Sequence, residues 1–142
     1  MTVSTRGRYA LRVMVDLAEH DNGEFIPLSD IADRQEISEK YLESIVAMLS
    51  KSGFVQSLRG KGGGYRLAKK PEEYTIRDIL EVTEGSLEPV PNLNNTDEGM
   101  RASVCREMDM WRGLYKAITD YLDSVTIRDI AGTEIGQYDF VI

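Results

Sequence analysis

Residues 59–65, with the sequence Arg-Gly-Lys-Gly-Gly-Gly-Tyr, constrain the fold of this chain more than any other segment. They lie between two short strand-like runs, Phe54 to Leu58 and Tyr65 to Leu67, and glycine adopts tight-turn conformations that other residues avoid. The segment therefore predicts a β-hairpin with a glycine-rich tip. The rival interpretation, a phosphate-cradling nucleotide site, requires a Gly-x-x-x-x-Gly-Lys-Ser/Thr order with a helix behind it. Neither is present here.

Three amphipathic segments precede this hairpin. Apolar residues recur at helical spacing from Thr5 to Glu19, a short second helix fits Ser29 to Arg34 with Ser29 as its N-cap, and a third helix follows Ser38 and ends near Ser52. The short break between the second and third helices is typical of a helix-turn-helix. With the hairpin directly behind it, the pattern predicts a winged helix, so we expect a mainly α fold with a small β-hairpin (α+β). Residues 1–70 are the expected DNA-binding domain.

The second half of the chain predicts a linker helix, a loop and a long helix within residues 71–131. A Ser/Thr-x-x-Asp/Glu capping pattern at Thr75 opens a helix that runs to Glu84, and residues 85–99, rich in Pro and Asn, predict a mobile loop. Beyond this loop, apolar residues alternate steps of four and three over three heptads. These candidate dimerisation residues are Val104, Met108, Trp111, Tyr115, Ile118, Leu122 and Val125.

This heptad seam predicts a homodimer. One helix cannot bury both the seam and the flanking Leu114 and Tyr121 against a domain of about 70 residues, so a second copy of the chain is the natural partner. In the alternative interpretation, the long helix folds back on its own domain.

Composition restricts the other possible classes. The chain has 142 residues, of which 42% are hydrophobic and 29% charged, as expected for a small globular domain with an appended element. No apolar stretch is long enough for a membrane span or a signal peptide, so we expect a cytoplasmic protein. One cysteine and one histidine are too few for a zinc site, and no nucleophile–base pair stands out. We therefore expect no catalytic activity, no metal and no cofactor.

The net charge of −7 is unevenly distributed. Residues 1–70 carry 11 Lys and Arg against 9 Asp and Glu, whereas residues 71–142 carry 6 against 15. The cations of the first half are also clustered, near residues 6–8, 59–61 and 66–70. A local basic cluster on an acidic body can bind a polyanion on one face, so the total charge does not argue against DNA.

Three arginines, Arg6, Arg8 and Arg12, stand in the first turns of the first helix, where the helix dipole disfavours cations. DNA phosphates at this helix end would be stabilised by the arginines together with free backbone N–H groups. The alternative is pairing with Asp or Glu of the second helix or of the dimer mate.

Three consecutive glycines at the hairpin tip bring no evident gain in stability, so we expect them to let the backbone approach an external partner.

The winged-helix pattern assigns the DNA-binding residues. The second helix of a helix-turn-helix enters the major groove, where Lys40 suits guanine or phosphate and Glu43 suits a cytosine amino group. Arg59 suits a narrow minor groove, where the potential is most negative. On their own, such helix residues are usually just a solvated helix face, and the winged-helix context reverses this preference. The predicted DNA-binding set is Arg6, Arg8, Ser38, Lys40, Tyr41, Glu43, Ser44, Arg59, Lys61, Gly62 and Gly63.

Three motifs, at residues 4–10, 37–43 and 59–65, closely resemble the Rrf2 family of bacterial winged-helix regulators. The resemblance extends from residue 1 to about residue 130. It implies a dimeric repressor that binds a palindromic DNA operator, with base-reading positions at Ser38, Lys40, Tyr41 and Glu43 and with Arg59 in the minor groove.

The iron–sulfur branch of this family carries three cysteines and a histidine in the loop before the long helix. Here Cys105 matches the third cysteine, whereas Leu93, Gly99 and Met108 stand at the other three positions. One thiolate cannot hold an ordinary four-ligand cluster. Cys105 remains a candidate redox sensor through an interchain disulfide, and ordinary packing of a lone thiol is the alternative.

The branch without those ligands, and most similar in length, is the cysteine-metabolism repressor of Gram-positive bacteria, which acts together with cysteine synthase. The tail expected at residues 132–142 is flexible and ends in apolar residues that are unfavourable in water and suit a pocket for a terminal carboxylate. Packing of the tail on its own dimer is the alternative. The candidate partner-binding residues are Tyr138, Phe140, Val141 and Ile142.

We therefore expect a dimeric repressor of cysteine and sulfur metabolism genes that binds cysteine synthase through its tail. Two alternatives stay open at this point. One is a protein-interaction subunit that modulates an enzyme and binds DNA weakly. The other is an iron–sulfur or redox-responsive regulator of the same family.

Overall fold

The computed structural model describes residues 2–94 and 99–132, so all of the predicted tail except its first residue lies outside the described residues. The helices and the single hairpin agree with the predicted fold class. The elements, in chain order, are α1 (Thr5–Glu19), α2 (Leu28–Gln35), α3 (Glu39–Lys51), β1 (Val55–Leu58), β2 (Gly64–Leu67), the 3-10 helix η1 (Pro71–Glu73), α4 (Ile76–Glu84), α5 (Ala102–Ser124) and α6 (Ile127–Ile130).

Local capping sets the ends of the first three helices. The Ser4 hydroxyl accepts a hydrogen bond from the Gly7 N–H at 3.0 Å, and the Ser38 hydroxyl accepts one from the Tyr41 N–H at 3.1 Å. The second helix differs from the prediction, because α2 begins at Leu28 and its N-cap is Pro27, not Ser29. Pro27 already has the extended conformation of an N-cap, and its carbonyl accepts the first helical hydrogen bond.

The hairpin is joined to the connection between α1 and α2. Strands β1 and β2 pair antiparallel, with Leu58 opposite Gly64. On the other side of β2, Ile26 and Tyr65 exchange two backbone hydrogen bonds of 2.8 Å each. The wing is therefore tied to the helical body by backbone hydrogen bonds at its β2 edge.

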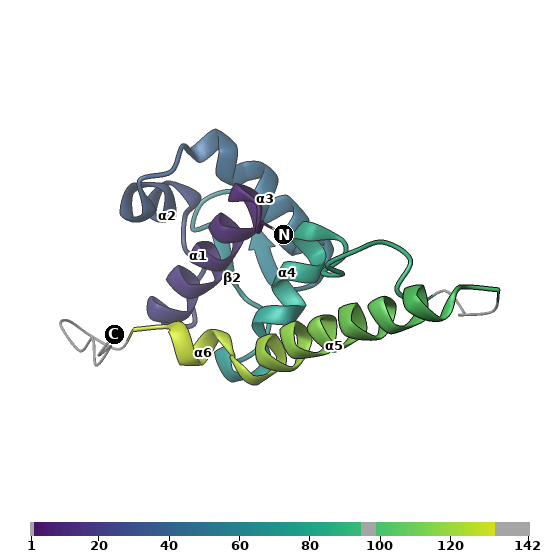
Figure 1. The fold of residues 1–142 in the computed structure, drawn as a ribbon. Helices are drawn as coiled ribbons and strands as arrows, with labels where there is room; N and C mark the ends of the chain where they lie inside the picture. Colours follow the sequence, from purple (N-terminus) through teal and green to yellow (C-terminus); the bar gives the residue numbers. More distant parts are fainter. Residues whose placement is uncertain (1, 95–98, 133–142) are drawn as a thin grey trace.

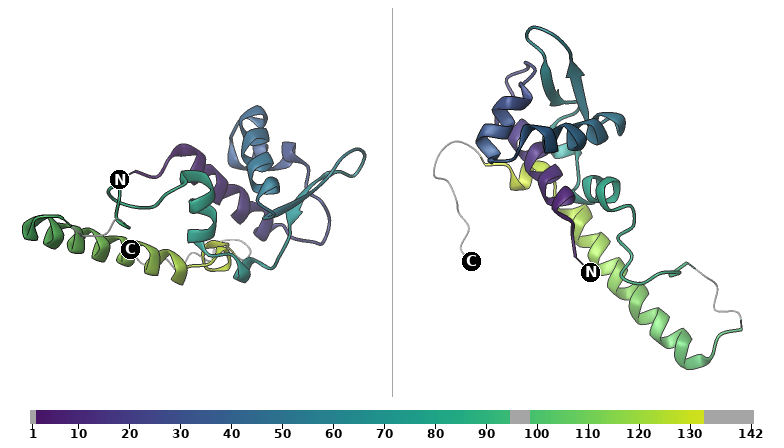
Figure 2. Two further views of the ribbon diagram at one scale, coloured as in Figure 1. Left: turned by 90° about the vertical axis from the view of Figure 1, so that its right-hand side faces the viewer. Right: turned by 90° about the horizontal axis from the view of Figure 1, so that it is seen from above.

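A single hydrophobic core runs across the predicted boundary at residue 70. Helix α1 lies at its centre, as Figures 1 and 2 show, and α3, α4 and α6 pack around it. The side chains of Met14, Leu42, Ile79 and Ile127 are all fully buried in this one cluster. The winged helix therefore depends on residues beyond its own 70 for its core.

Helix α6 was not predicted, although the chain carries a local signal for it. The sequence Thr-Ile-Arg-Asp occurs at residues 75–78 and again at 126–129, and in both places it forms a capping box. The two segments pair side by side: the Ile76 N–H donates to the Val125 carbonyl, and the Ile127 N–H donates to the Tyr74 carbonyl, each at 2.9 Å. A four-residue helix has no apolar periodicity, so the repeat is its only sequence signature.

Helix α5 extends well beyond the winged-helix body (Figures 1 and 2). Its predicted seam is used in part within the chain itself, because Tyr115, Leu122 and Val125 pack against the core. The alternative in which the helix folds back on its own domain thus applies to the C-terminal half of α5.

The segment before α5 is packed in its described part. Leu87 and Leu93, 3% and 2% exposed, are buried, and the Arg112 side chain donates to the Leu93 carbonyl at 3.0 Å. The burial of these two leucines stabilises the segment in one position, so the expectation of a mobile loop does not suit residues 85–94.

No helix of the described ranges is both long enough and apolar enough to cross a bilayer.

Candidate DNA-binding face

Helix α3 turns its apolar side to the core and its predicted reading side to solvent. All five predicted residues, from Ser38 to Ser44, are exposed. The Ser38 hydroxyl is engaged as the N-cap, and the Ser44 hydroxyl donates to the Tyr41 carbonyl at 2.9 Å. Lys40 and Glu43 have no hydrogen-bond or ion-pair partner within residues 2–94 and 99–132, so they are the two of these five side chains that are most available to DNA.

Tyr41 is held from the side by α1. Its ring meets the Tyr9 ring edge to face, with centroids 5.6 Å apart, and the Arg12 guanidinium lies 5.4 Å from the centre of the Tyr9 ring. Tyr41 nevertheless keeps 39% of its surface exposed. One ring edge is thus packed, and the remainder is accessible at the predicted DNA-binding surface.

Arg12 has an internal partner. Its guanidinium donates to the Gln35 side chain at 3.1 Å and to the Gln35 carbonyl at 2.6 Å. The alternative of pairing with the second helix is therefore right for Arg12, with an amide residue in place of Asp or Glu. Arg8 donates to the Thr5 hydroxyl at 3.2 Å, and Arg6 has no partner among the residues that the structure describes.

The N-terminal end of α1 is supplied with an anion from within the chain. A Glu84 side-chain oxygen accepts the Ser4 N–H at 2.6 Å, and a Cβ built on Gly7 would lie 2.6 Å from that oxygen. Since a carboxylate satisfies the dipole at this helix end, the expectation of free N–H groups awaiting a DNA phosphate is corrected in part. Arg6 and Arg8 remain exposed beside it.

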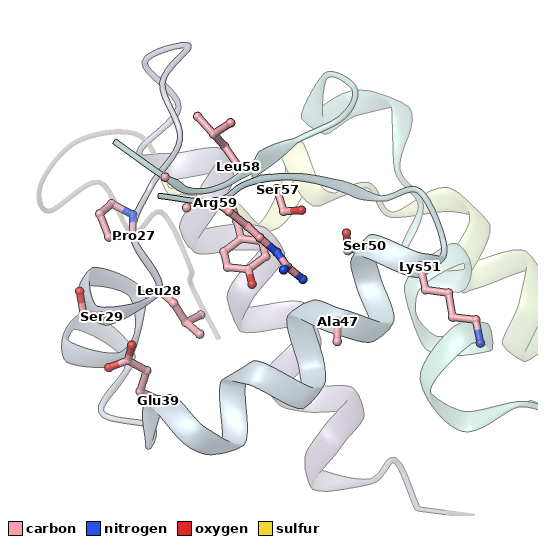
Figure 3. A pocket seen from close by; sticks show the side chains of 13 residues that line it. Pro27, Leu28, Ser29, Glu39, Ala47, Ser50, Lys51, Ser57, Leu58 and Arg59 are labelled. Carbon is pink, nitrogen blue, oxygen red and sulfur yellow. The ribbon is translucent and has the colours of Figure 1, made fainter. Parts of the chain in front are cut away.

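The wing and α3 enclose a cleft of about 520 Å³ (Figure 3). Ala47, Ser50 and Lys51 of α3 line one side of it, and Leu58 and Arg59 line the other. In Figure 3 the Arg59 side chain reaches from the hairpin towards α3. Its charge has no partner in the described part of the chain, and neither has that of Lys61 at the exposed wing tip.

Two glycines of the tip are required by close contacts within the chain itself. This differs from the expectation that they bring no gain in stability. At Gly64 the φ angle is +151°, and a Cβ would meet the Ile26 carbonyl oxygen at 2.2 Å. At Gly63 a Cβ would meet the Leu58 carbonyl oxygen at 2.3 Å. The backbone that passes close to these residues is the chain's own. Gly62, with φ of +76° and open space around its Cβ position, is required by the turn alone.

A buried ionic cluster behind the face was missed from the sequence. The carboxylate of Asp16 is fully buried and accepts two hydrogen bonds from the Arg34 guanidinium, at 2.7 and 3.0 Å, and one from Gln35 at 2.8 Å. The hydrogen bond to Asp16 raises the pKa of Arg34 above its ordinary value. The cluster fixes α2 on α1, and through the turn it positions α3. An acidic residue beside the apolar stripe of α1 was the available signal.

The winged helix and its partner-free cations define a DNA-binding protein of the helix-turn-helix class. The chain belongs to the Rrf2 family, described as iron-dependent transcriptional regulators, whose family model matches residues 3–133. It is 35% identical to the HTH-type transcriptional regulator CymR of Bacillus subtilis over 98% of this chain and 96% of the relative. It is 35% identical to IscR of Aliivibrio salmonicida, over 92% of this chain and 77% of the relative.

The solved structure of CymR from B. subtilis superimposes with a TM-score of 0.78 at 37% identity, covering 92% of this chain and 96% of that one. These relatives are named transcriptional regulators, which agrees with the expectation of a regulator and not an enzyme. The prediction of the family and of the winged-helix fold is confirmed.

The family description implies iron, and the donor set of this chain does not fit it. The chain has one cysteine, Cys105 on α5, and one histidine, His20 at the end of α1. Leu93, at a position that the resemblance matches to a cluster ligand, is a buried apolar side chain. Within the described ranges, no three His, Cys, Asp or Glu side chains are grouped so that they could hold one metal ion. One thiolate does not hold an iron–sulfur cluster.

Proposed function

We propose that this chain is a dimeric transcriptional repressor that reads a palindromic operator with α3 in the major groove and the wing in the minor groove. The carrying observation is that Lys40, Arg59 and Lys61 are exposed and have no partner in the described part of the chain. Two further arginines of this half of the chain, Arg12 and Arg66, have internal partners. Exposed cations that a fold leaves unpaired suit a polyanion.

The chemistry of the free side chains suits base reading. Lys40 lies in the first turn of α3, the part of a recognition helix that reaches base edges, and it suits guanine or a phosphate. Glu43 suits a cytosine amino group, which gives the helix both a donor and an acceptor. Arg59 suits an A·T-rich minor groove, whose narrowness increases the negative potential.

The dimer is proposed to form along α5. Met110, Leu114 and Tyr121 are 52%, 41% and 67% exposed, and their spacing of four and seven residues places them on one face of the helix. An apolar stripe of this kind, on a helix that extends from the body, suits contact with a second copy. The predicted seam is therefore revised: its C-terminal residues serve the core, and the flanking stripe is proposed as a large part of the dimer contact. A two-fold dimer requires a palindromic site.

The test is the salt dependence of binding to the operator, located by a footprint on the protein's own promoter. Contacts to several phosphates should give a log–log slope of several units, whereas a flat slope would favour the enzyme-modulating subunit. Arg59→Ala should weaken binding by about 1–3 kcal/mol. Lys116→Ala is the matched control, because Lys116 lies on α5 and pairs with Asp120. Equal effects of the two substitutions would contradict the proposal.

We also propose that the regulated genes serve cysteine and sulfur metabolism and that cysteine synthase is a partner. The support is the similarity over nearly the whole chain to CymR, whose structure is titled the global cysteine regulator of B. subtilis. The apolar end of the chain, Val141 and Ile142, is the proposed contact.

This second proposal is tested by deleting Val141 and Ile142 and titrating the variant with cysteine synthase. By linkage, operator DNA should tighten enzyme binding by the same factor by which the enzyme tightens DNA binding. Undiminished affinity of the shortened chain would remove the tail from the mechanism.

A further inference from the structure

Arg66 belongs to the basic run at residues 66–70, yet it lies on the side of the hairpin that faces away from α3. Side chains of a strand alternate between the two faces, and Tyr65 and Ser57 line the cleft with α3. Arg66 and Gln56, which are paired across the two strands, therefore share the opposite face. The charge of Arg66 is thus directed away from the cleft that holds Arg59.

The Arg66 guanidinium has three contacts within the chain. Its Nε donates to the Gln56 side-chain oxygen at 2.9 Å, and an Nη donates to the Gly23 carbonyl at 2.9 Å. Its carbon lies 4.2 Å from the centre of the Phe25 ring, a cation–π geometry. One planar group therefore links both wing strands to the connection between α1 and α2, 43 residues away in sequence.

The same connection holds the wing through its backbone. Ile26 and Tyr65 exchange two hydrogen bonds of 2.8 Å, and Gly64 passes against the Ile26 carbonyl. These bonds fix the edge of β2 at a single residue pair. The Arg66 contacts add a side-chain connection between the hairpin and the same segment.

We infer that Arg66 is a positioning residue of the wing, which holds the hairpin at the angle that presents Arg59 and Lys61 to the minor groove. This inference rests on the proposed DNA-binding function. It assigns Arg66 no phosphate contact, although the residue stands in a basic run. The two roles require different properties of the side chain. A phosphate contact requires only a positive charge, whereas the positioning role requires the planar guanidinium group of arginine.

The first experiment measures affinity for the operator duplex between low and high salt for wild type, Arg66→Lys, Arg66→Ala and Phe25→Leu. All three variants should bind about tenfold more weakly, with the salt slope of the wild type. Lys61→Ala is the comparison, and its slope should fall by about one, because one cation fewer then neutralises a phosphate. Wild-type affinity of Arg66→Lys, together with a reduced slope for Arg66→Ala, would overturn the inference.

The second experiment measures coupling within the wing. If Arg66 acts through the hairpin, Arg59→Ala should weaken binding much less in an Arg66→Ala background than in the wild type. Additive losses would contradict a positioning role, since a residue that only stabilised the body would not alter the effect of Arg59.

Hydrogen exchange of the free protein separates this inference from the proposed function. Arg66→Ala should speed exchange of the Tyr65 and Ile26 amides relative to those of α1. If the wild type ignores DNA, the proposed function fails. Unchanged exchange rates in Arg66→Ala would overturn the positioning role of Arg66, whether or not the wild type binds DNA.

Discussion

Replacing Gly64 by alanine tests whether the glycines of the wing tip serve the chain itself. A Cβ at this position would lie 2.2 Å from the Ile26 carbonyl oxygen, a backbone atom that cannot turn aside. The substitution therefore requires the pairing of Ile26 with Tyr65 to open. Gly62→Ala is the matched control, because its φ is also positive but the space around it is open.

The expected magnitudes differ between the two variants. Opening the pair removes two backbone hydrogen bonds of 2.8 Å, each worth about 0.5–1.5 kcal/mol. A positive φ costs alanine about 1–2 kcal/mol at either site. The free energy of unfolding should thus fall by about 2–5 kcal/mol for Gly64→Ala and by about 1–2 kcal/mol for Gly62→Ala.

Urea unfolding of the free protein, followed by far-ultraviolet circular dichroism, measures both values without DNA. With a slope of about 1–3 kcal/mol per molar urea, the two midpoints should differ by about 1 M. Equal midpoints would refute the reasoning, since they would mean that Gly64 has no steric function inside the chain. A large loss of DNA affinity in Gly62→Ala alone would then indicate that the glycines allow the backbone to approach DNA.

Three further predictions concern the core, the wing junction and the dimer. Asp16→Ala should lower the free energy of unfolding by about 3 kcal/mol, because the Arg34 guanidinium and the Gln35 amide lose the buried carboxylate that they bind at the α1–α2 contact. Thermal denaturation measures this loss, and an unchanged midpoint would contradict the prediction. Burial raises the pKa of Tyr74 above 10.0, so its contribution to stability is complete below pH 10.0 and is lost as the pH rises through the higher folded value. Tyr74→Phe should remove the part of the fall in stability at alkaline pH that comes from Tyr74. At neutral pH it should lower the free energy of unfolding by about 1 kcal/mol, because the Phe54 carbonyl loses its hydrogen-bond donor. A difference in stability between the two proteins that is equal at pH 7 and pH 11 would argue against this role of Tyr74. Leu114→Glu should shift the chain from dimer to monomer in sedimentation at micromolar concentration, and an unchanged dimer would place the contact elsewhere.

The order of the helices and of the hairpin was predictable because each depends on contacts within a few residues. Ser38 caps α3 as its spacing to Tyr41 predicts, and Thr75 with Asp78 opens α4 in the same way. The apolar helical spacing predicted from Thr5 to Glu19 coincides with α1. The repeated capping box would have predicted α6 as well, although not its pairing with the start of α4.

The candidate site was predictable only as a set of charges. The sequence by itself does not show which of Arg12, Arg59 and Arg66 has a partner inside the chain. The tertiary structure decides that Arg12 binds Gln35 and Arg66 binds Gly23, while Arg59 has no partner among the residues that the structure describes. The physical reason is that each choice depends on a residue more than twenty positions away, brought near only when the core closes around α1. Local patterns carry no information on such neighbours.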